Sequence, residues 1–168
     1  MLAQVAHCED APLVVELGGG TGAITQVLLD SMRPDGRLLV FEILPEFVEI
    51  LRARFADSRL EIVPTSATSL DAALDDRGIG QLKCIVSSLP LFHMPRTQSL
   101  RILRMICERL APDGNLVVDQ RTPFRLGLLR AVFPYVRVKR LVLSEVPPSF
   151  VILCRAQASP PGTFVEQA

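Results

Sequence analysis

The sequence is poor in aromatic residues and carries no net charge. It has no tryptophan and one tyrosine among 168 residues, and its eighteen basic side chains match its eighteen acidic ones. A balanced chain has no overall field that would draw it to nucleic acid or to acidic lipid. Charged residues make up 21% of the chain and hydrophobic residues 49%, which excludes a disordered chain and predicts one globular domain.

Long apolar runs and paired cysteine motifs are also absent. No run approaches the roughly 18 residues of a membrane span. The N-terminus lacks the charged, apolar and small-residue order of a signal peptide. The cysteines form no CxxC pair and have no histidine at metal-ligand spacing; they are Cys8, Cys84, Cys107 and Cys154. We therefore predict free buried thiols, no metal site and a cytoplasmic location.

The charge balance hides an uneven distribution along the chain. Residues 1–95 carry seven basic and thirteen acidic side chains, whereas residues 96–140 carry ten and three. A solvated helix face is the simpler interpretation of this basic stretch. The alternative is a peripheral contact with an anionic membrane at its inner face, where each basic group contributes about 1 kcal/mol.

Apolar, β-rich segments alternate with segments of helical period. Strands are expected at 12–17, 37–42, 59–63, 83–88 and 115–120, and helices at 23–31, 45–55, 70–77, 96–110 and 124–133. Two further strands, 136–143 and 150–154, have no room for a helix between them and must be antiparallel. This order predicts an α/β fold with a doubly wound, mostly parallel seven-stranded sheet and a C-terminal antiparallel hairpin. Residues 1–155 would form the domain, and 156–168 a loose tail.

The expected helix at 96–110 has an apolar and a charged face. The side chains predicted to face inward are Leu100, Leu103, Cys107 and Leu110, and those predicted to face outward are Arg101, Arg104 and Glu108.

A glycine-rich loop follows the first expected strand and reads Glu16, Leu17, Gly18, Gly19, Gly20, Thr21, Gly22. In a doubly wound sheet, ligands bind outside the carboxyl ends of the strands. Glycines let the backbone approach a ligand closely, and the following helix offers unpaired N–H groups. A tight turn without a ligand is the alternative. Gly18, Gly20 and Ala23 also fit the GxGxxA pattern of dinucleotide sites, so an oxidoreductase is a more distant hypothesis.

Glu16 stands two residues before the first glycine, which makes the pattern ExGxGxG. This pattern resembles motif I of class I S-adenosyl-L-methionine (SAM) methyltransferases. The resemblance implies a Rossmann-like fold, SAM as the cofactor and a methyltransferase activity. The residues that it places at the cofactor are Glu16, Gly18, Gly19, Gly20, Gly22, Glu42, Ile43, Ser66, Ala67 and Ser87. Glu42, at the end of the second strand, stands where such sheets place a carboxylate for ribose hydroxyls.

The segment SSLPLFHMP, residues 87–95, follows the fourth expected strand. It resembles the SGLPL-type motif of bacterial phospholipid N-methyltransferases, which methylate phosphatidylethanolamine. Three more stretches, VVELGGGTGAIT, FEILPEFVEILRARF and PPSFVILCRA, are similar to that family. The resemblance implies a lipid or small amine as acceptor, and it places Ser88, Leu89, Pro90, Leu91 and Phe92 at the substrate. His93 is the one candidate base near this loop, although an ordinary loop histidine is the simpler interpretation.

Two alternatives remain open. The rRNA adenine dimethyltransferases carry an NLPY or NLPF motif, in which an Asn aligns the amine and an aromatic ring stacks on the base. Here Ser88 and Leu91 stand at those positions, so nucleic acid is the less favoured partner. The SAM families also use an Asp for the adenine amine where this chain has Ser66, and a neutral hydroxyl holds an amine less strongly. A degenerate SAM-fold protein with weak or no catalysis is therefore the second alternative.

Overall fold

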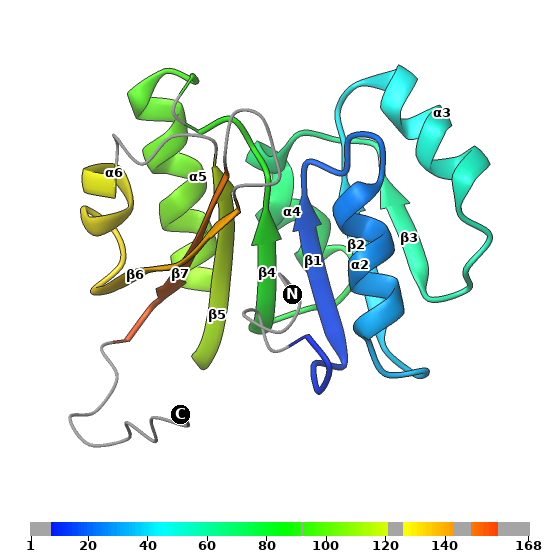
Figure 1. Cartoon of the computed structure of the whole chain (residues 1–168), viewed down its shortest axis with the longest axis horizontal. Coiled ribbons are helices and arrows are strands. Elements are labelled where there is room, and N and C mark those ends of the chain that lie inside the picture. Colours follow the sequence, from blue (N-terminus) through cyan, green and yellow to red (C-terminus); the bar gives the residue numbers. More distant parts are fainter. Residues whose placement is uncertain (1–7, 92, 121–125, 143–148, 158–168) are drawn as a thin grey trace.

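The computed structural model describes residues 8–91, 93–120, 126–142 and 149–157. Strands and helices alternate along the chain until the terminal hairpin (Figure 1). In order, they are β1 (Leu13–Leu17), α2 (Ala23–Ser31), β2 (Arg37–Phe41), α3 (Pro45–Arg54), β3 (Leu60–Val63), the 3₁₀ turn η1 (Ala67–Ser69), α4 (Leu70–Asp75), β4 (Leu82–Ser87), α5 (Arg96–Arg109), β5 (Leu110–Gln120), α6 (Leu126–Arg130), β6 (Tyr135–Val142) and β7 (Ser149–Arg155).

The strands form one seven-stranded sheet in the order β3-β2-β1-β4-β5-β7-β6. The first five strands run parallel, whereas β7 is antiparallel to both β5 and β6. The predicted doubly wound sheet with a terminal antiparallel hairpin is confirmed. Strand order reverses between β1 and β4, and in sheets of this kind the crevice at that switch point is where ligands bind.

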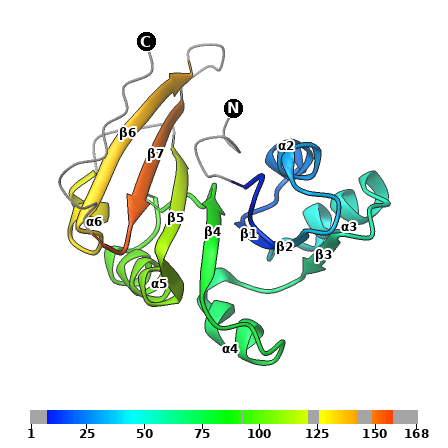
Figure 2. The same cartoon turned by 90° about the horizontal axis from the view of Figure 1, so that it is seen from below.

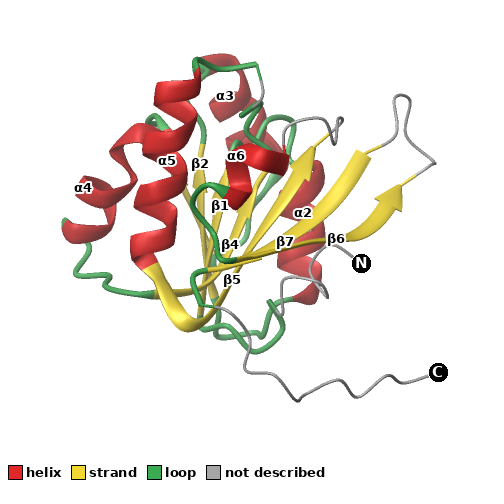
Figure 3. Ribbon diagram, turned by 90° about the vertical axis from the view of Figure 1, so that its left-hand side faces the viewer, coloured by secondary structure: helices red, strands yellow, loops and turns green. Residues whose placement is uncertain are grey.

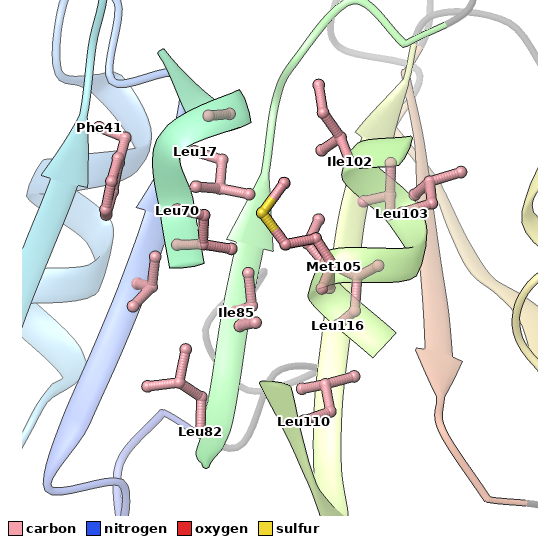
Figure 4. Close-up of a cluster of buried hydrophobic side chains, with 14 of the residues drawn as sticks. Leu17, Phe41, Leu70, Leu82, Ile85, Ile102, Leu103, Met105, Leu110 and Leu116 are labelled. Atoms are coloured by element: carbon pink, nitrogen blue, oxygen red, sulfur yellow. The ribbon is translucent and has the colours of Figure 1, made fainter. Parts of the chain in front are cut away.

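Helices cover both faces of the sheet. Figure 2 shows α2 and α3 on one side and α4 and α5 on the other. Two separate apolar clusters result, because a parallel sheet buries side chains on both of its faces. In the larger cluster, Figure 4 shows side chains of α4 and α5 packed over β1, β4 and β5, with Met105 reaching from α5 toward Leu70 on α4.

The face of helix α5 that packs on the core is broader than the sequence pattern predicted. Its buried side chains are Ser99, Ile102, Leu103, Met105 and Ile106, whereas Leu100 and Cys107 are half-buried and pack against the same cluster. All four side chains predicted to face inward therefore contact the core, with Leu110 now beginning β5. A serine can be buried on this face because its hydroxyl donates a hydrogen bond to the Leu91 carbonyl at 2.7 Å, which removes the cost of burying it.

The remaining expectations differ mainly at element boundaries. Strand β5 begins at Leu110 rather than at residue 115, and its register against β4 shifts between Leu82 and Cys84. The predicted helix at 124–133 corresponds to α6, which ends at Arg130, while residues 124 and 125 lie outside the described residues. Most of the predicted tail lies outside the described residues, so the domain boundary at residue 155 stays a prediction.

The cysteines and the membrane-span search complete the description. All four cysteines are free, and Cys107 alone is half-buried rather than buried. Within the described ranges, no helix combines the length and the apolarity needed to cross a membrane. The same ranges hold no group of three or more His, Cys, Asp or Glu side chains placed to hold a metal ion.

Candidate active site

The glycine loop lies against the carboxyl end of β2. The N–H groups of Gly18 and Gly19 both donate to the Phe41 carbonyl, at 2.8 and 3.3 Å. Gly18 and Gly20 have φ angles of +87° and +52°, a region that L side chains rarely adopt. A Cβ on Gly20 would meet nothing within 4 Å, so this turn leaves open space beside its backbone.

Two other glycines of the loop make room for α3. A Cβ on Gly19 would lie 2.4 Å from Val40 Cγ1, and one on Gly22 would lie 2.4 Å from the Phe55 ring. Both neighbours belong to the packing of β2 and α3 rather than to an open site. The sequence placed these glycines at the cofactor, and the structure shows that their missing side chains let the loop pack against the helix.

Glu42 joins the glycine loop to the start of α3. Its Oε2 accepts a hydrogen bond from the Gly20 N–H at 2.8 Å, and its Oε1 accepts from the N–H groups of Ile43 and Leu44 at 2.8 and 2.9 Å. The side chain is buried. A carboxylate has about four lone-pair sites, so Oε2 keeps acceptor capacity for a hydroxyl of a ligand. The position predicted for a ribose carboxylate is therefore occupied by a fixed, preorganised acid.

Glu16 is the buried acid of the site. Its Oε2 accepts a hydrogen bond from the Thr25 hydroxyl of α2 at 2.7 Å, and its Oε1 is buried without a partner among the described residues. Burial raises the pKa of Glu16 to about 8, with a smaller raising contribution from Glu42 that opposes the Thr25 hydrogen bond. The sequence did not point to Thr25, although its place on the first turn of the helix after the loop is the signal that could have found it.

The adenine side of the predicted site is formed by the loops after β2 and β3. Ile43 is 61% exposed, which is unusual for a large apolar side chain beside a buried acid. Ser66 precedes η1, and its hydroxyl oxygen accepts hydrogen bonds from the Thr68 N–H at 3.2 Å and the Thr68 hydroxyl at 2.9 Å. Ala67 is buried in the core. Ser66 therefore works first as a helix cap, with its own proton still available to a ligand.

The loop after β4 is fastened to the glycine loop. The Ser88 hydroxyl donates to the Gly18 carbonyl at 2.5 Å, and the Ser88 N–H donates to the Leu17 carbonyl at 3.0 Å. A further hydrogen bond holds this loop from β5, where the Gln120 side-chain amide donates to the Leu89 carbonyl at 2.6 Å. Ser87, which is fully buried, ends β4 beside Leu17. The loop predicted to hold the acceptor is thereby held directly against the loop predicted to hold the cofactor.

The other residues of the predicted acceptor segment differ in their exposure to solvent. Pro90 is exposed, but Leu91 is 1% exposed and packs in the larger core cluster, so its side chain is a packing residue. Phe92 lies outside the described residues. His93 is exposed in the turn before α5.

SAM would fit these residues. It carries positive charge at its sulfonium and ammonium, which suits a buried carboxylate oxygen such as Glu16 Oε1 that lacks a partner. Its ribose hydroxyls suit Glu42, and the flat face of adenine suits the exposed apolar side chain of Ile43. The open space at Gly20 lets a ligand approach the backbone.

Comparison with known families and proteins agrees with this geometry. The model of a family described as "Methyltransferase domain" matches residues 14–114. The ornithine lipid N-methyltransferase of Singulisphaera acidiphila is 40% identical over 108 residues, which are 64% of this chain and 56% of that protein. The ribosomal RNA small subunit methyltransferase A of Nitrosospira multiformis is 32% identical over 143 residues, which are 76% of this chain and 54% of that protein. The chain thus spans about half the length of these curated relatives.

Solved structures agree on the fold. The N-methyltransferase NodS from Bradyrhizobium japonicum superposes with a TM-score of 0.70 at 16% identity, over 92% of this chain and 91% of that one. Human N-acetylserotonin methyltransferase, solved with SAM, superposes with a TM-score of 0.68 at 17% identity, over 92% of this chain and 50% of that one. The chain therefore belongs to the methyltransferase-domain family and has the Rossmann-like fold of class I SAM-dependent methyltransferases.

Proposed function

We propose that this chain transfers the methyl group of SAM to the amine of a lipid headgroup at the cytoplasmic face of a membrane. The observation that carries the proposal is the hydrogen bond between Ser88 and Gly18, which joins the loop after β4 to the glycine loop. It supports the proposal because the segment that resembles the lipid family's acceptor motif lies beside the glycine loop. The 40% identity to an ornithine lipid N-methyltransferase supports a lipid amine in particular.

Each part of the site has a role in this proposal. Glu42 would accept the ribose hydroxyls, Ile43 would cover the adenine, and the Ser66 hydroxyl would contact the adenine edge. Glu16 would face the positively charged methionine end. When bound, SAM supplies a methyl group on a sulfonium that is already a good leaving group, so the protein mainly has to align the acceptor and exclude water.

The acceptor amine has to lose a proton before it attacks. By analogy with lysine, such an amine titrates near pH 10, so a base or a dry pocket lowers the barrier. Among the loop residues, we assign His93 as the candidate that takes this proton. A His93→Gln variant stays polar but has no basic nitrogen to take the proton, so it should reduce kcat. An unchanged kcat would mean that His93 is an ordinary loop residue.

The first experiment is a calorimetric titration with S-adenosylhomocysteine (SAH), which needs no acceptor to be known. We expect micromolar binding that is lost in Glu42→Ala. Methyl transfer is then measured with SAM and vesicles that contain phosphatidylethanolamine or ornithine lipid. Binding of SAH without transfer to either lipid would contradict the proposal of a lipid amine.

Methylation of rRNA adenine is the second candidate, and the 32% identity to a ribosomal RNA methyltransferase favours it. Transfer to an rRNA fragment but not to lipid vesicles would establish it in place of the lipid.

A non-catalytic SAM-fold protein is the remaining alternative. A Ser66→Asp variant tests it, because a carboxylate should hold the adenine amine more strongly than a hydroxyl. A large gain in SAH affinity, still without transfer to any amine, would favour loss of catalysis.

A further inference from the structure

A groove separates η1 and α4 from α5, on the face of the sheet opposite α2 and α3. Figure 3 shows α4 and α5 side by side on this face. The groove has a volume of about 520 Å³ and is lined by Thr68, Ser69, Thr97, Arg101, Arg104 and Glu108, among others. None of these residues belongs to the cofactor or acceptor site described above. The volume lies in the range of small-molecule sites.

The arginines of α5 are in different electrostatic states. Arg109, at the C-terminal end of α5, bonds two carboxylates of α4, Asp71 at 2.5 Å and Asp75 at 2.7 Å. Further up the same helix, Arg101 and Arg104 are exposed and have no ion pair or hydrogen bond among the described residues. Asp71 and Asp75 of α4 therefore pair with Arg109, and neither of them pairs with Arg101 or Arg104 beside the groove.

Hydroxyl groups gather at the end of the groove where Arg101 lies. Thr97 is on the first turn of α5, and Thr68 and Ser69 are in η1 on the opposite wall. The side chains of Thr97 and Ser69 have no hydrogen-bond partner among the described residues. This end follows Ser66 and the loop after β4 in the chain, so it opens at the same edge of the sheet as the candidate active site.

We propose that this groove binds the phosphate group of a lipid headgroup. Two arginines three positions apart on one helix form a pair of charged donors, and arginine matches phosphate geometry through paired N–H bonds. The free hydroxyls supply further donors from both walls. Glu108 carries the one negative charge of the lining that no basic side chain of the described residues neutralises, so the anion binds nearer to Arg101.

The choice of a lipid as the source of the phosphate rests on the proposed function. A headgroup held in this groove would turn the carboxyl edge of the sheet, and with it the acceptor loop, toward the membrane surface. A free phosphate in the same groove would bind the same arginines and hydroxyls without any membrane. An RNA backbone would also supply phosphates. The experiment therefore separates these sources from one another.

The test measures co-sedimentation of the full chain with vesicles of phosphatidylglycerol in phosphatidylcholine, which contain no amine acceptor. The double variant Arg101→Gln with Arg104→Gln removes two charges from the groove. The matched control, Lys139→Gln with Arg140→Gln, removes two charges from β6 at the far edge of the sheet, where both side chains are exposed. We expect the groove variant to bind about thirtyfold more weakly, at about 1 kcal/mol for each basic group, and the control less than about threefold.

A gain-of-affinity variant makes the test independent of folding defects. Glu108→Gln removes the opposing negative charge, so it should strengthen vesicle binding about two- to threefold at low salt. Equal losses in the groove variant and the β6 control would overturn the proposal, because a diffuse basic surface would then explain binding. Binding of inorganic pyrophosphate or of a single-stranded RNA through Arg101 and Arg104, without vesicle binding, would also overturn it.

The outcome is separable from that of the proposed function. SAH binding needs no lipid, so the groove variant should keep its SAH affinity. If the groove variant loses vesicle binding and keeps normal SAH binding, the result supports the groove proposal and does not test the proposed activity. Groove-dependent vesicle binding without methyl transfer to any amine lipid would instead contradict the proposed activity and leave the groove as a membrane contact.

Discussion

The glycine-loop site and the α4–α5 groove use titratable side chains in opposite ways. Around the glycine loop these side chains are acidic and buried, and their partners are mostly backbone N–H groups or a hydroxyl, as for Glu42 and Glu16. Beside the groove they are basic and exposed, and Arg101 and Arg104 lack partners in the described part of the chain. The free energy of a buried titratable group depends on the position of each neighbouring atom, whereas exposed charges act through a screened field. Single substitutions should therefore have large effects on stability or binding in the first region and small effects in the second.

The largest expected effect is the pH dependence of stability caused by Glu16. Its pKa is about 8 in the folded chain and 4.5 in the unfolded chain, so the folded chain holds the extra proton between these values. The free energy of unfolding should therefore fall as pH rises through this window, by up to about 1.4 kcal/mol per pH unit. Urea unfolding from pH 5 to 8 measures the slope.

Two variants make the origin of that slope clear. Glu16→Gln carries no titrating group and should flatten the slope, while Glu46→Gln, an exposed acid at the start of α3, should leave it unchanged. A slope that survives in Glu16→Gln would mean that a group other than Glu16 causes it. That result would contradict the expected difference between a buried acid and an exposed one.

The second prediction concerns Gly19, whose backbone packs against β2 and α3. Gly19→Ala would place a Cβ 2.4 Å from Val40 and 2.9 Å from Leu51, two fully buried side chains. Overpacking of this kind costs about 1–3 kcal/mol, and we expect the upper end because Val40 is held within the sheet. The control is Gly80→Ala, because a Cβ on Gly80 meets nothing within 4 Å and should change stability by less than about 0.5 kcal/mol. Urea unfolding measures both variants. Similar unfolding midpoints would show that the loop can shift without a loss of stability.

The third prediction replaces the Glu42 carboxylate by an amide of the same shape. Glu42→Gln keeps one acceptor oxygen but points its NH₂ group either at the Gly20 N–H or at the N–H groups of Ile43 and Leu44, which need an acceptor. Hydrogen bonds to charged groups contribute about 1.5–3 kcal/mol, so SAH affinity should fall roughly thirtyfold. Titration calorimetry measures the loss, with Glu49→Gln on the exposed face of α3 as the control. Affinity within twofold of the unchanged chain would remove Glu42 from the site.

Sequence patterns predicted the parts of the fold that depend on local periodicity. Helix α2 begins and ends at the predicted residues, and the mostly parallel sheet with its closing antiparallel hairpin follows from the alternation of elements. The burial of Ser99 and the hydrogen bond of Gln120 to the loop after β4 were not predictable, because each depends on a carbonyl that folding brings near from elsewhere in the chain. A buried polar residue looks like a surface residue until its partner is known.

The candidate site shows the same division. The ExGxGxG pattern located the loop, and the acid after β2 located Glu42, since both occupy fixed positions at strand ends. The sequence also located a basic stretch at residues 96–140 but not its electrostatic state. That state depends on whether α4 supplies a carboxylate, which it does for Arg109 and does not for Arg101 or Arg104.

The smallest expected effect separates the paired arginine of α5 from an unpaired one. Arg109 joins α5 to two carboxylates of α4, but its partners are about half exposed or more, so solvent screening limits the gain. Arg109→Ala should lower the free energy of unfolding by about 1 kcal/mol, whereas Arg104→Ala, on the same helix, should change it by less than about 0.5 kcal/mol. Urea unfolding at low and high salt measures both, and salt should narrow the difference. A larger loss in Arg104→Ala would mean that this arginine stabilises the fold, and a stabilising arginine would have less freedom to bind an anion in the groove.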